Sequence, residues 1–338
     1  MIVTLTANPS VDRTMQLDSP IVRGDVFRAV SVGDQAGGKG VNVARAVAHA
    51  GVPALAVLPA DDDDLLVKGL AEAGVLPVNV PTGRPSRVNI TVTEPDGTTT
   101  KFNDPGHELR EGVLDEVAAR LLGRSQAGDW VVLSGSLPPG APIDWYADLT
   151  AELKSAGRRV AVDTSGATLT ATVRDRATLP DLLKPNAEEL ASLTGDDEAV
   201  LEADPAAAAV VAGKLVADGI GSVLLTLGSA GAALVTAEGA WLAAPPPIIL
   251  RSTVGAGDAS LAGYLLADLQ GLDAPGRLRE AVAYGAAAAS LPGSTMPREG
   301  DLDRDGVTIT TLAPAAPGQR TPPPPPADTG LLAAHPKE

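Results

Sequence analysis

Short apolar runs rich in Val, Ile and Leu alternate with alanine-rich stretches along most of the chain. In one such stretch, Val41, Ala44, Val47 and Ala48 recur at the spacing that places them on one face of a helix. Strands that alternate with helices indicate a mostly parallel sheet covered by helices on both faces. We therefore expect an α/β fold, with strands at 2–6, 55–58, 130–133, 159–162, 182–184 and 223–227, and helices at 41–50, 144–155, 205–217, 256–269 and 277–290.

Two regions depart from this pattern, because no helix separates their strands. Residues 11–17 with 26–32, and 87–93 with 98–102, alternate apolar and polar positions, and a Glu-Pro-Asp-Gly turn at 94–97 lies within the second pair. Such pairs are typical of antiparallel hairpins. We expect a small β-sheet, formed by about 11–32 and 87–103, that projects from the α/β body as a lid.

The end of the chain has a different composition. From about residue 313 it is low in complexity and includes a proline run at 322–326. Proline lacks the N–H group that a strand needs and favours polyproline II. We expect one domain over 1–312, followed by a flexible proline-rich tail at 313–338.

Charge and composition narrow the possible chemistry. Lys and Arg number 26 against 42 Asp and Glu, so the net charge is −16, which disfavours nucleic acid and anionic membranes as partners. Cys is absent and the three His are scattered, which argues against thiolate nucleophiles, Cys-ligated zinc and a histidine triad. Since the chain has neither a signal-like start nor 18 uninterrupted apolar residues, we expect a cytoplasmic protein. Carboxylates, backbone amides and a few cations remain for catalysis.

The segment Gly255-Ala256-Gly257-Asp258 opens one of the expected helices. Small residues there let a ligand approach the backbone, and the free amides of a first helical turn attract anions. Asp258 in that turn is well placed to accept a proton from a hydroxyl that attacks a phosphoryl group. A plain helix N-terminus with a favourable acidic residue is the alternative interpretation.

A second glycine cluster spans 33–40 and nearly fits the P-loop pattern. Position 40 is Gly where a P-loop has Ser or Thr, and no strand leads tightly into the cluster, so we reject a P-loop. Gly38 and its neighbours would still admit a small polar ligand, Lys39 could pair with an anion, and Asn42 could bond to hydroxyls. A tight turn before a helix is the alternative.

Two further segments follow expected strands. Asn186 and Glu189, in Lys184-Pro185-Asn186-x-x-Glu189, could form a capping box at a helix start or hold waters around Mg²⁺. The turn 226–231 suits nucleotide phosphates or ribose, although hairpin turns have the same composition.

Several single charges allow two interpretations. Asp12 follows the first strand and could bind sugar hydroxyls or belong to a turn, while Arg87 and Lys101 on the lid could be ordinary solvated charges. The acidic run 61–64 fits a helix start better than a metal site.

Taken together, in their order along the chain, the motifs resemble those of the PfkB (ribokinase-like) carbohydrate kinases. The resemblance covers about residues 1–300 and is carried by the segments 37–44, 134–140, 184–189 and 252–258. It implies a three-layer α/β/α fold with a small β lid, and an enzyme that uses ATP and Mg²⁺. The segments 6–12, 23–26 and 86–90 resemble the branch that acts on phosphorylated ketohexoses, especially the enzymes that phosphorylate the C6 hydroxyl of fructose 1-phosphate. Tagatose 6-phosphate and fructose 6-phosphate remain alternative substrates, and a sensor without activity is an alternative of another class.

The resemblance also implies roles for individual residues. Asp258 would be the base and the amides of Gly255, Ala256, Gly257 and Asp258 an anion hole. The family often has a polar residue near the adenine, whereas 286–289 here is four alanines, so we expect apolar contacts and backbone to hold the base. The resemblance also motivates a homodimer formed through the lid. The other implied site residues are Asp12, Gly38, Asn42 and Asn89 for the sugar; Lys39, Arg87 and Lys101 for its phosphate; Lys184, Asn186, Thr226, Leu227, Gly228, Ser229, Ala230, Gly231 and Gly257 for ATP; and Asn186 with Glu189 for Mg²⁺ through water.

Overall fold

The computed structural model describes residues 1–312, so the expected tail lies outside the described residues. The main sheet contains β1 (Ile2–Thr6), β4 (Ala54–Pro59), β5 (Leu76–Val80), β8 (Trp130–Ser134), β9 (Arg159–Asp163), β10 (Leu182–Leu183), β11 (Ser222–Thr226), β12 (Ala232–Thr236), β13 (Gly239–Ala244) and β14 (Thr308–Leu312). Their order is β14-β13-β12-β11-β10-β9-β8-β1-β4-β5. Neighbours from β11 to β5 run parallel, and β12, β13 and β14 extend the sheet in antiparallel fashion.

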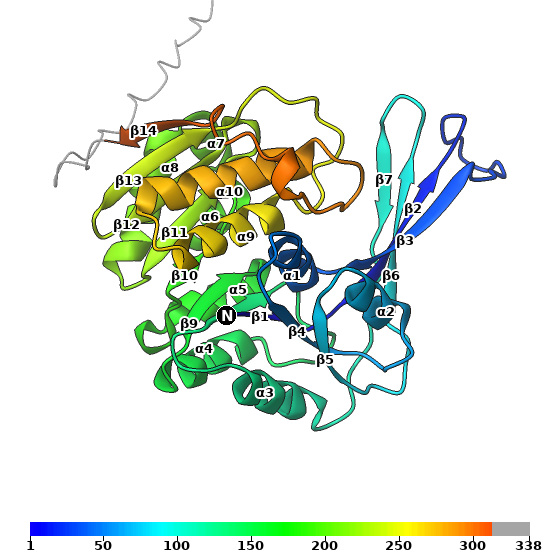
Figure 1. The fold of residues 1–338 in the computed structure, drawn as a ribbon, viewed down its shortest axis with the longest axis horizontal. Coiled ribbons are helices and arrows are strands. Elements are labelled where there is room, and N and C mark those ends of the chain that lie inside the picture. Colours follow the sequence, from blue (N-terminus) through cyan, green and yellow to red (C-terminus); the bar gives the residue numbers. More distant parts are fainter. Residues whose placement is uncertain (313–338) are drawn as a thin grey trace, which may run out of the picture.

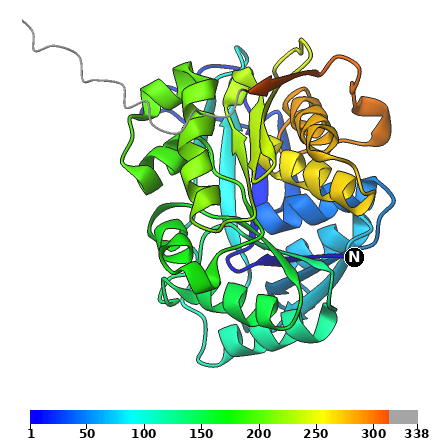
Figure 2. The ribbon, with the colours of Figure 1, turned by 90° about the vertical axis from the view of Figure 1, so that its left-hand side faces the viewer.

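Helices cover both faces of this sheet, which Figure 2 shows nearly edge-on. On one face lie α1 (Lys39–His49), α2 (Leu65–Glu72), α9 (Ala256–Leu269) and α10 (Ala274–Ala289). On the other lie α3 (Val113–Arg124), α4 (Trp145–Ser155), α5 (Gly166–Arg174), α6 (Ala187–Thr194), α7 (Glu198–Ala203) and α8 (Pro205–Ala217). The central strands are apolar on both faces because both are buried, and two cores result.

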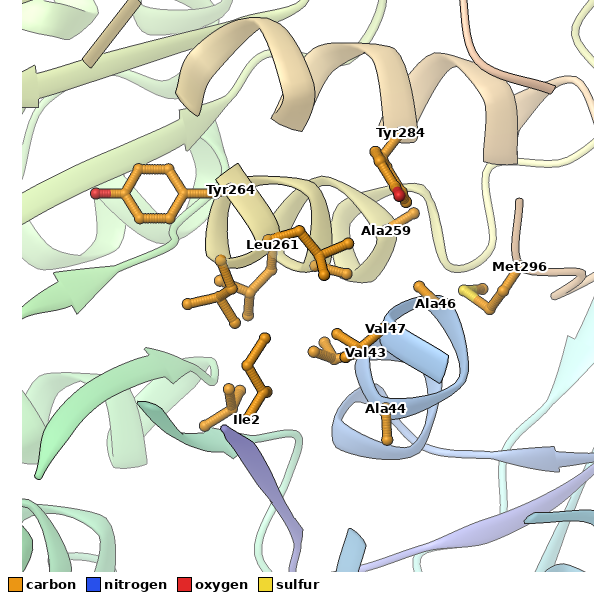
Figure 3. Close-up of a cluster of buried hydrophobic side chains, with 14 of the residues drawn as sticks. Ile2, Val43, Ala44, Ala46, Val47, Ala259, Leu261, Tyr264, Tyr284 and Met296 are labelled. Atoms are coloured by element: carbon orange, nitrogen blue, oxygen red, sulfur yellow. The ribbon is translucent and has the colours of Figure 1, made fainter. Parts of the chain in front are cut away.

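Small residues allow the helices of the first face to approach the sheet closely. Ile2 of β1 meets Val43 and Val47 of α1, with Leu261 of α9 above them (Figure 3). Buried alanines line the interfaces of α9 with α1 and α10, so these helices pack closely and their first turns lie near the strand ends. This packing fixes the position of Asp258 relative to Asn42.

A second sheet of four strands projects from the body (Figure 1). Its order is β3 (Ser31–Gly37), β2 (Ser10–Gln16), β6 (Arg87–Thr93) and β7 (Thr99–Phe102). The pairings β2–β3 and β6–β7 are antiparallel, whereas β2 and β6 run parallel. Asp12 lies opposite both Asn89 and Gln35, so one face of this lid carries polar side chains at its base.

The α/β class, the mostly parallel sheet and the separate lid are confirmed. The strand expected at 26–32 is wrong, because β3 begins at Ser31 and Val26 is 88% exposed. The chain turns at Gly24-Asp25, and pairing with β2 begins only at Val30, whose N donates to Gln16 O at 2.8 Å. The small residues Ala36 and Gly37, at the end of β3, pack against Gly69 and Asp12. No helix within 1–312 is long and apolar enough to cross a membrane.

Candidate active site

The carboxyl ends of β1, β8, β9 and β10 meet the first turns of α1 and α9. Thr6 lies beside Ser134, and Ser134 beside Asp163, in the register of neighbouring parallel strands. Lys184 follows β10, and its Nζ lies 3.1 Å from Asp163 Oδ2. Polar side chains thus form a row across the strand ends, which is where ligands bind in open α/β sheets.

The start of α9 provides a backbone surface for an anion. Gly255 is its N-cap residue with φ 79°, a left-handed conformation that favours glycine. A Cβ built on Gly257 would lie 3.4 Å from the Lys184 ammonium, so this cation faces the same helical turn. The first-turn amides lack partners within their helix and can donate to an anion beside Lys184.

Asp258 is a buried carboxyl in that first turn, only 7% exposed. Its Oδ2 accepts a hydrogen bond of 2.8 Å from the Asn42 amide nitrogen. Burial, followed by repulsion from Asp163, raises the pKa of Asp258 to about 6, although Lys39, Asn42 and Lys184 act in the opposite direction. A carboxylate with this pKa binds a proton more readily than an ordinary Asp and is still largely ionised near neutral pH.

Asp163 is a site residue that the sequence interpretation missed. It is 1% exposed and bonds to Lys39 Nζ at 2.7 Å as well as facing Lys184. Burial alone would raise the pKa of Asp163, but Lys184 and Lys39 lower it overall. The available signal was an acidic residue directly after a buried apolar strand, the same signal that drew attention to other strand ends.

Lys39 contacts acidic groups of β9 and α6. Besides the Asp163 bond, its Nζ lies 3.9 Å from Glu189 Oε1. Burial would lower the pKa of Lys39, yet Asp163 and Glu189 raise it overall, so the side chain is charged. None of the described ion pairs joins Lys39 to the lid.

The polar face of the lid brings Asp12 and Asn89 together. Asp12 Oδ1 accepts from Ser10 Oγ at 2.8 Å and from Asn89 Nδ2 at 3.1 Å. A Cβ on Gly37 would lie 2.3 Å from this carboxylate, so the glycine makes room for it. The carboxylate and amide are therefore fixed next to the Gly37-Gly38 segment.

Arg87 is a half-buried cation at the base of the lid. Its Nε donates to Asn8 O at 3.2 Å and its Nη1 to Asp104 O at 2.6 Å. Burial lowers its pKa, with Asp12 and Asp104 opposing the effect. Both hydrogen-bond acceptors are neutral carbonyls, so the Arg87 charge has no ion-pair partner within the described chain.

Lys101 lies on β7, the edge strand of the lid. It pairs with Thr91 of β6 through the backbone, and its exposed side chain has no hydrogen bond or ion pair with other described residues. Of the three expected phosphate cations, only Arg87 contacts the segment that leads from β1 into the lid.

The expected capping box is present at the start of α6. Asn186 Oδ1 accepts from Glu189 N at 2.7 Å, and Glu189 Oε2 accepts from Asn186 N at 2.9 Å. Glu189 Oε1 instead faces Lys39. Residues 1–312 contain no cluster of three or more metal-binding side chains. This donor set fits a hydrated Mg²⁺ carried by phosphates better than an all-protein cage.

The glycine-rich turn 226–231 follows β11 and includes the short helix Gly228–Ala230. Gly231 has φ 95°, and a Cβ there would lie 2.0 Å from Ala243 O. The turn therefore lies tightly against β13, and Thr226 pairs with Asn186 in an isolated bridge. The capping box and this turn are thus neighbours.

A family model for pfkB family carbohydrate kinases matches residues 5–298. The chain belongs to this family. Among curated relatives of this kinase, the 1-phosphofructokinase of Xanthomonas campestris is 39% identical over 286 residues, covering 82% of this chain and 88% of the relative. The 1-phosphofructokinase of Rhodobacter capsulatus is 37% identical and covers 93% and 98%.

Solved structures agree with the fold of the kinase. Phosphofructokinase-2 from Escherichia coli, in complex with substrates and products, superposes with a TM-score of 0.82 at 31% identity, covering 89% of this chain and 96% of the other. A tetrameric inhibited form of the same E. coli enzyme superposes with a TM-score of 0.76 at 32% identity, covering 86% and 92%. The ribokinase-like architecture expected from the motifs is confirmed.

Proposed function

We propose that this kinase is a 1-phosphofructokinase, which transfers the γ-phosphoryl group of ATP to the C6 hydroxyl of fructose 1-phosphate. The observation that carries the proposal is the juxtaposition of Asp258, the first turn of α9 and Lys184. It combines a base, an anion-binding backbone and a cation, which are what phosphoryl transfer requires. The relatives named 1-phosphofructokinase supply the choice of substrate.

In the proposed reaction, Asp258 accepts the proton of the C6 hydroxyl as that oxygen bonds to the γ-phosphorus. The bond between this phosphorus and the bridging oxygen breaks, and ADP leaves. The amides of Gly255, Ala256, Gly257 and Asp258, together with Lys184, stabilise the charge of the transferring group. Mg²⁺ bound to the ATP phosphates would neutralise charge, and Asn186 and Glu189 would hold its waters.

We assign the sugar hydroxyls to the polar face at the base of the lid. Asp12 and Asn89 are already oriented by Ser10, and Gly38 and Asn42 approach from the start of α1. The turn Thr226–Gly231 would hold the nucleotide, with the apolar residues 286–289 toward its base.

The existing phosphate of the substrate would bind chiefly to Arg87. Lys39 and Lys184 are both paired with the Asp163 carboxylate, whereas Arg87 bonds only to neutral carbonyls. Arg87 also lines a cavity of about 450 Å³ together with Arg84, Arg110 and Glu108, so three guanidinium groups and one carboxylate border it. Lys101 would approach from the lid, and Lys39 would contribute nearer to the transferring phosphoryl group. A phosphate dianion needs such paired cations to leave water.

A homodimer through the lid remains part of the proposal. Val32 and Phe102, 56% and 58% exposed, alternate with the polar face in the register of the lid. Pairing with a second copy would cover these side chains and the sheet edges. A monomer by light scattering at assay concentration would contradict this. The cytoplasmic location stays a prediction.

The test is release of ADP with MgATP, comparing kcat/KM for fructose 1-phosphate, fructose 6-phosphate, tagatose 6-phosphate and free fructose. We expect a preference for fructose 1-phosphate of about a hundredfold, about 2.7 kcal/mol in transition-state binding. A preference for either 6-phosphate would overturn the phosphate assignment but retain Asp258 and the nucleotide site. Binding without turnover of any of the four would favour the sensor.

A further inference from the structure

Arg45 is a buried cation without a carboxylate partner. It lies in α1, is 9% exposed, and none of the ion pairs found within residues 1–312 includes it. Its Nη1 instead lies 3.1 Å from Ala36 O, 3.2 Å from Ser294 O and 3.3 Å from Asn42 Oδ1. Burying a guanidinium among neutral oxygens is unfavourable unless each of them is well placed, so this arrangement needs an explanation.

One of these contacts determines which way the Asn42 amide faces. A guanidinium only donates hydrogen bonds, so the amide end that faces Arg45 must be the carbonyl oxygen. The amide nitrogen of Asn42 is then directed to Asp258 Oδ2, 2.8 Å away. With the amide reversed, the carbonyl would face a carboxylate and the NH₂ group would face a cation, and both contacts would be repulsive.

The other two contacts join segments that border the site. Ala36 is next to the end of β3, where Gly37 contacts Asp12. Ser294 belongs to the segment that leads to Met296, whose Cε would lie 2.5 Å from a Cβ at Gly255. Met296 lies beside Ala46 of α1 in Figure 3. The Arg45 guanidinium therefore contacts three parts of the site: the end of β3 at the base of the lid, the Asn42 amide, and the segment 294–296 next to the start of α9.

We propose that Arg45 is a positioning residue: its guanidinium holds the Asn42 amide so that the NH₂ group donates to Asp258 and aims this carboxylate at the sugar hydroxyl. The inference rests on the proposed function only in taking Asp258 as the base. Arg45 touches neither substrate nor reacting atoms and acts through Asn42. The charged groups that face Asp258 are Lys39 from α1, Asp163 from β9 and Lys184 after β10.

The test is a double-mutant cycle between Arg45→Lys and Asn42→Ala, measured in the full-length chain. We expect Arg45→Lys to lower kcat about tenfold, with KM for MgATP changed less than twofold. In the Asn42→Ala background the same substitution should change kcat less than twofold, because the group through which it acts is gone. Arg45→Gln, which retains an amide donor for the carbonyls, serves if Arg45→Lys does not fold.

Arg158→Lys is the matched control. Arg158 also donates to backbone carbonyls, those of Ala156, Leu122 and Ser125, but it precedes β9 at the opposite end of the strand from Asp163. We expect it to lower the melting temperature about as much as Arg45→Lys while leaving kcat unchanged. A wild-type kcat in folded Arg45→Lys, or an equal loss in the Asn42→Ala background, would overturn the proposal.

A readout independent of turnover separates this inference from the proposed function. The carboxyl ¹³C signal of Asp258, assigned by its loss in Asp258→Asn, can be titrated in wild type and in Arg45→Lys. Because the bond from Asn42 lowers the pKa of Asp258, we expect its titration midpoint to rise in Arg45→Lys. An unmoved midpoint would overturn the role of Arg45 even in a protein that phosphorylates another sugar.

Discussion

Replacing Asp163 by Asn should alter both the stability and the pH dependence of this kinase. The carboxylate is 1% exposed and faces Lys184, whose side chain is 5% exposed. Removing one partner of a buried ion pair costs about 3 kcal/mol. The pair with Lys39 adds less, since the Lys39 side chain is 35% exposed and screened by water. A loss of about 3 kcal/mol should lower the melting temperature by about 4 °C in a chain of this size.

The sign of the effect on pH dependence follows from the groups around Asp258. Asp163 is the charged neighbour that raises the pKa of Asp258 to about 6, while Lys39 and Lys184 lower it. In Asp163→Asn the repulsion disappears and both cations remain, so the pKa of Asp258 should fall below 6. The acidic limb of kcat/KM for the sugar, measured with saturating MgATP, should therefore move to lower pH.

Asp268→Asn is a matched control for this prediction. Asp268 lies at the far end of α9 and, like Asp163, pairs with two cations, here Arg159 and Arg277; its side chain is 10% exposed. Asp268→Asn should also lower the melting temperature, as Asp163→Asn does, but it should leave the acidic limb of the kcat/KM profile for the sugar in place. An acidic limb that stays in place or moves to higher pH in folded Asp163→Asn would refute the reasoning.

Three further substitutions test other parts of the site. Burial raises the pKa of Asp258 to about 6, so folding opposes its ionisation and stability falls as pH rises from about 4 to 6. Asp258→Asn should therefore increase the free energy of unfolding near pH 7 by about 3 kcal/mol while kcat falls about 10²–10⁴-fold, and a lower stability in urea titrations would contradict this. Gly255→Ala should cost about 1 kcal/mol through its φ of 79°, and more because Met296 Cε, 2.5 Å from the new Cβ, must move; it should also lower kcat. Gly271→Ala, with φ 74° and open space around it, should cost only the backbone contribution and leave kcat unchanged. Arg87→Met should raise KM for fructose 1-phosphate about 10–100-fold and leave KM for MgATP unchanged in initial-rate assays, and a change in KM for MgATP alone would assign Arg87 to the nucleotide.

Local patterns were sufficient to predict the main elements of the fold. The expected helices 205–217 and 256–269 coincide with α8 and α9, because each begins at a strong N-terminal signal and keeps an apolar face throughout. The strand β5 was missed since Pro77 interrupts its pattern, which an edge strand tolerates. The antiparallel strands β12 and β13 were missed because alanines and a glycine there carry little strand propensity.

Side-chain partners within the site were harder to predict than the site itself. The motifs placed Asp258, Asn42 and Lys184 near one another, and the structure has them in contact or facing one turn of α9. Asp163 could not be selected from many acidic residues, because its importance arises from two cations distant in sequence. For Lys101 the difficulty is different: which residues it faces depends on the register of β7 with β6, which the alternation of apolar and polar residues does not determine.

The site also explains how so plain a composition can support phosphoryl transfer. A chain without Cys, with three His and few aromatic residues, relies on the direction of its backbone: parallel strands end together, and two helices begin at that edge. Glycine and alanine at those helix starts leave space beside the backbone, so that the amides of α9 and the side chains of Lys39 and Lys184 can lie close together. Asp163 then keeps the lysines in place, and its own charge raises the proton affinity of Asp258. One buried carboxylate thus positions the cations and raises the pKa of the proposed base, which links the stability of the site to its proposed chemistry.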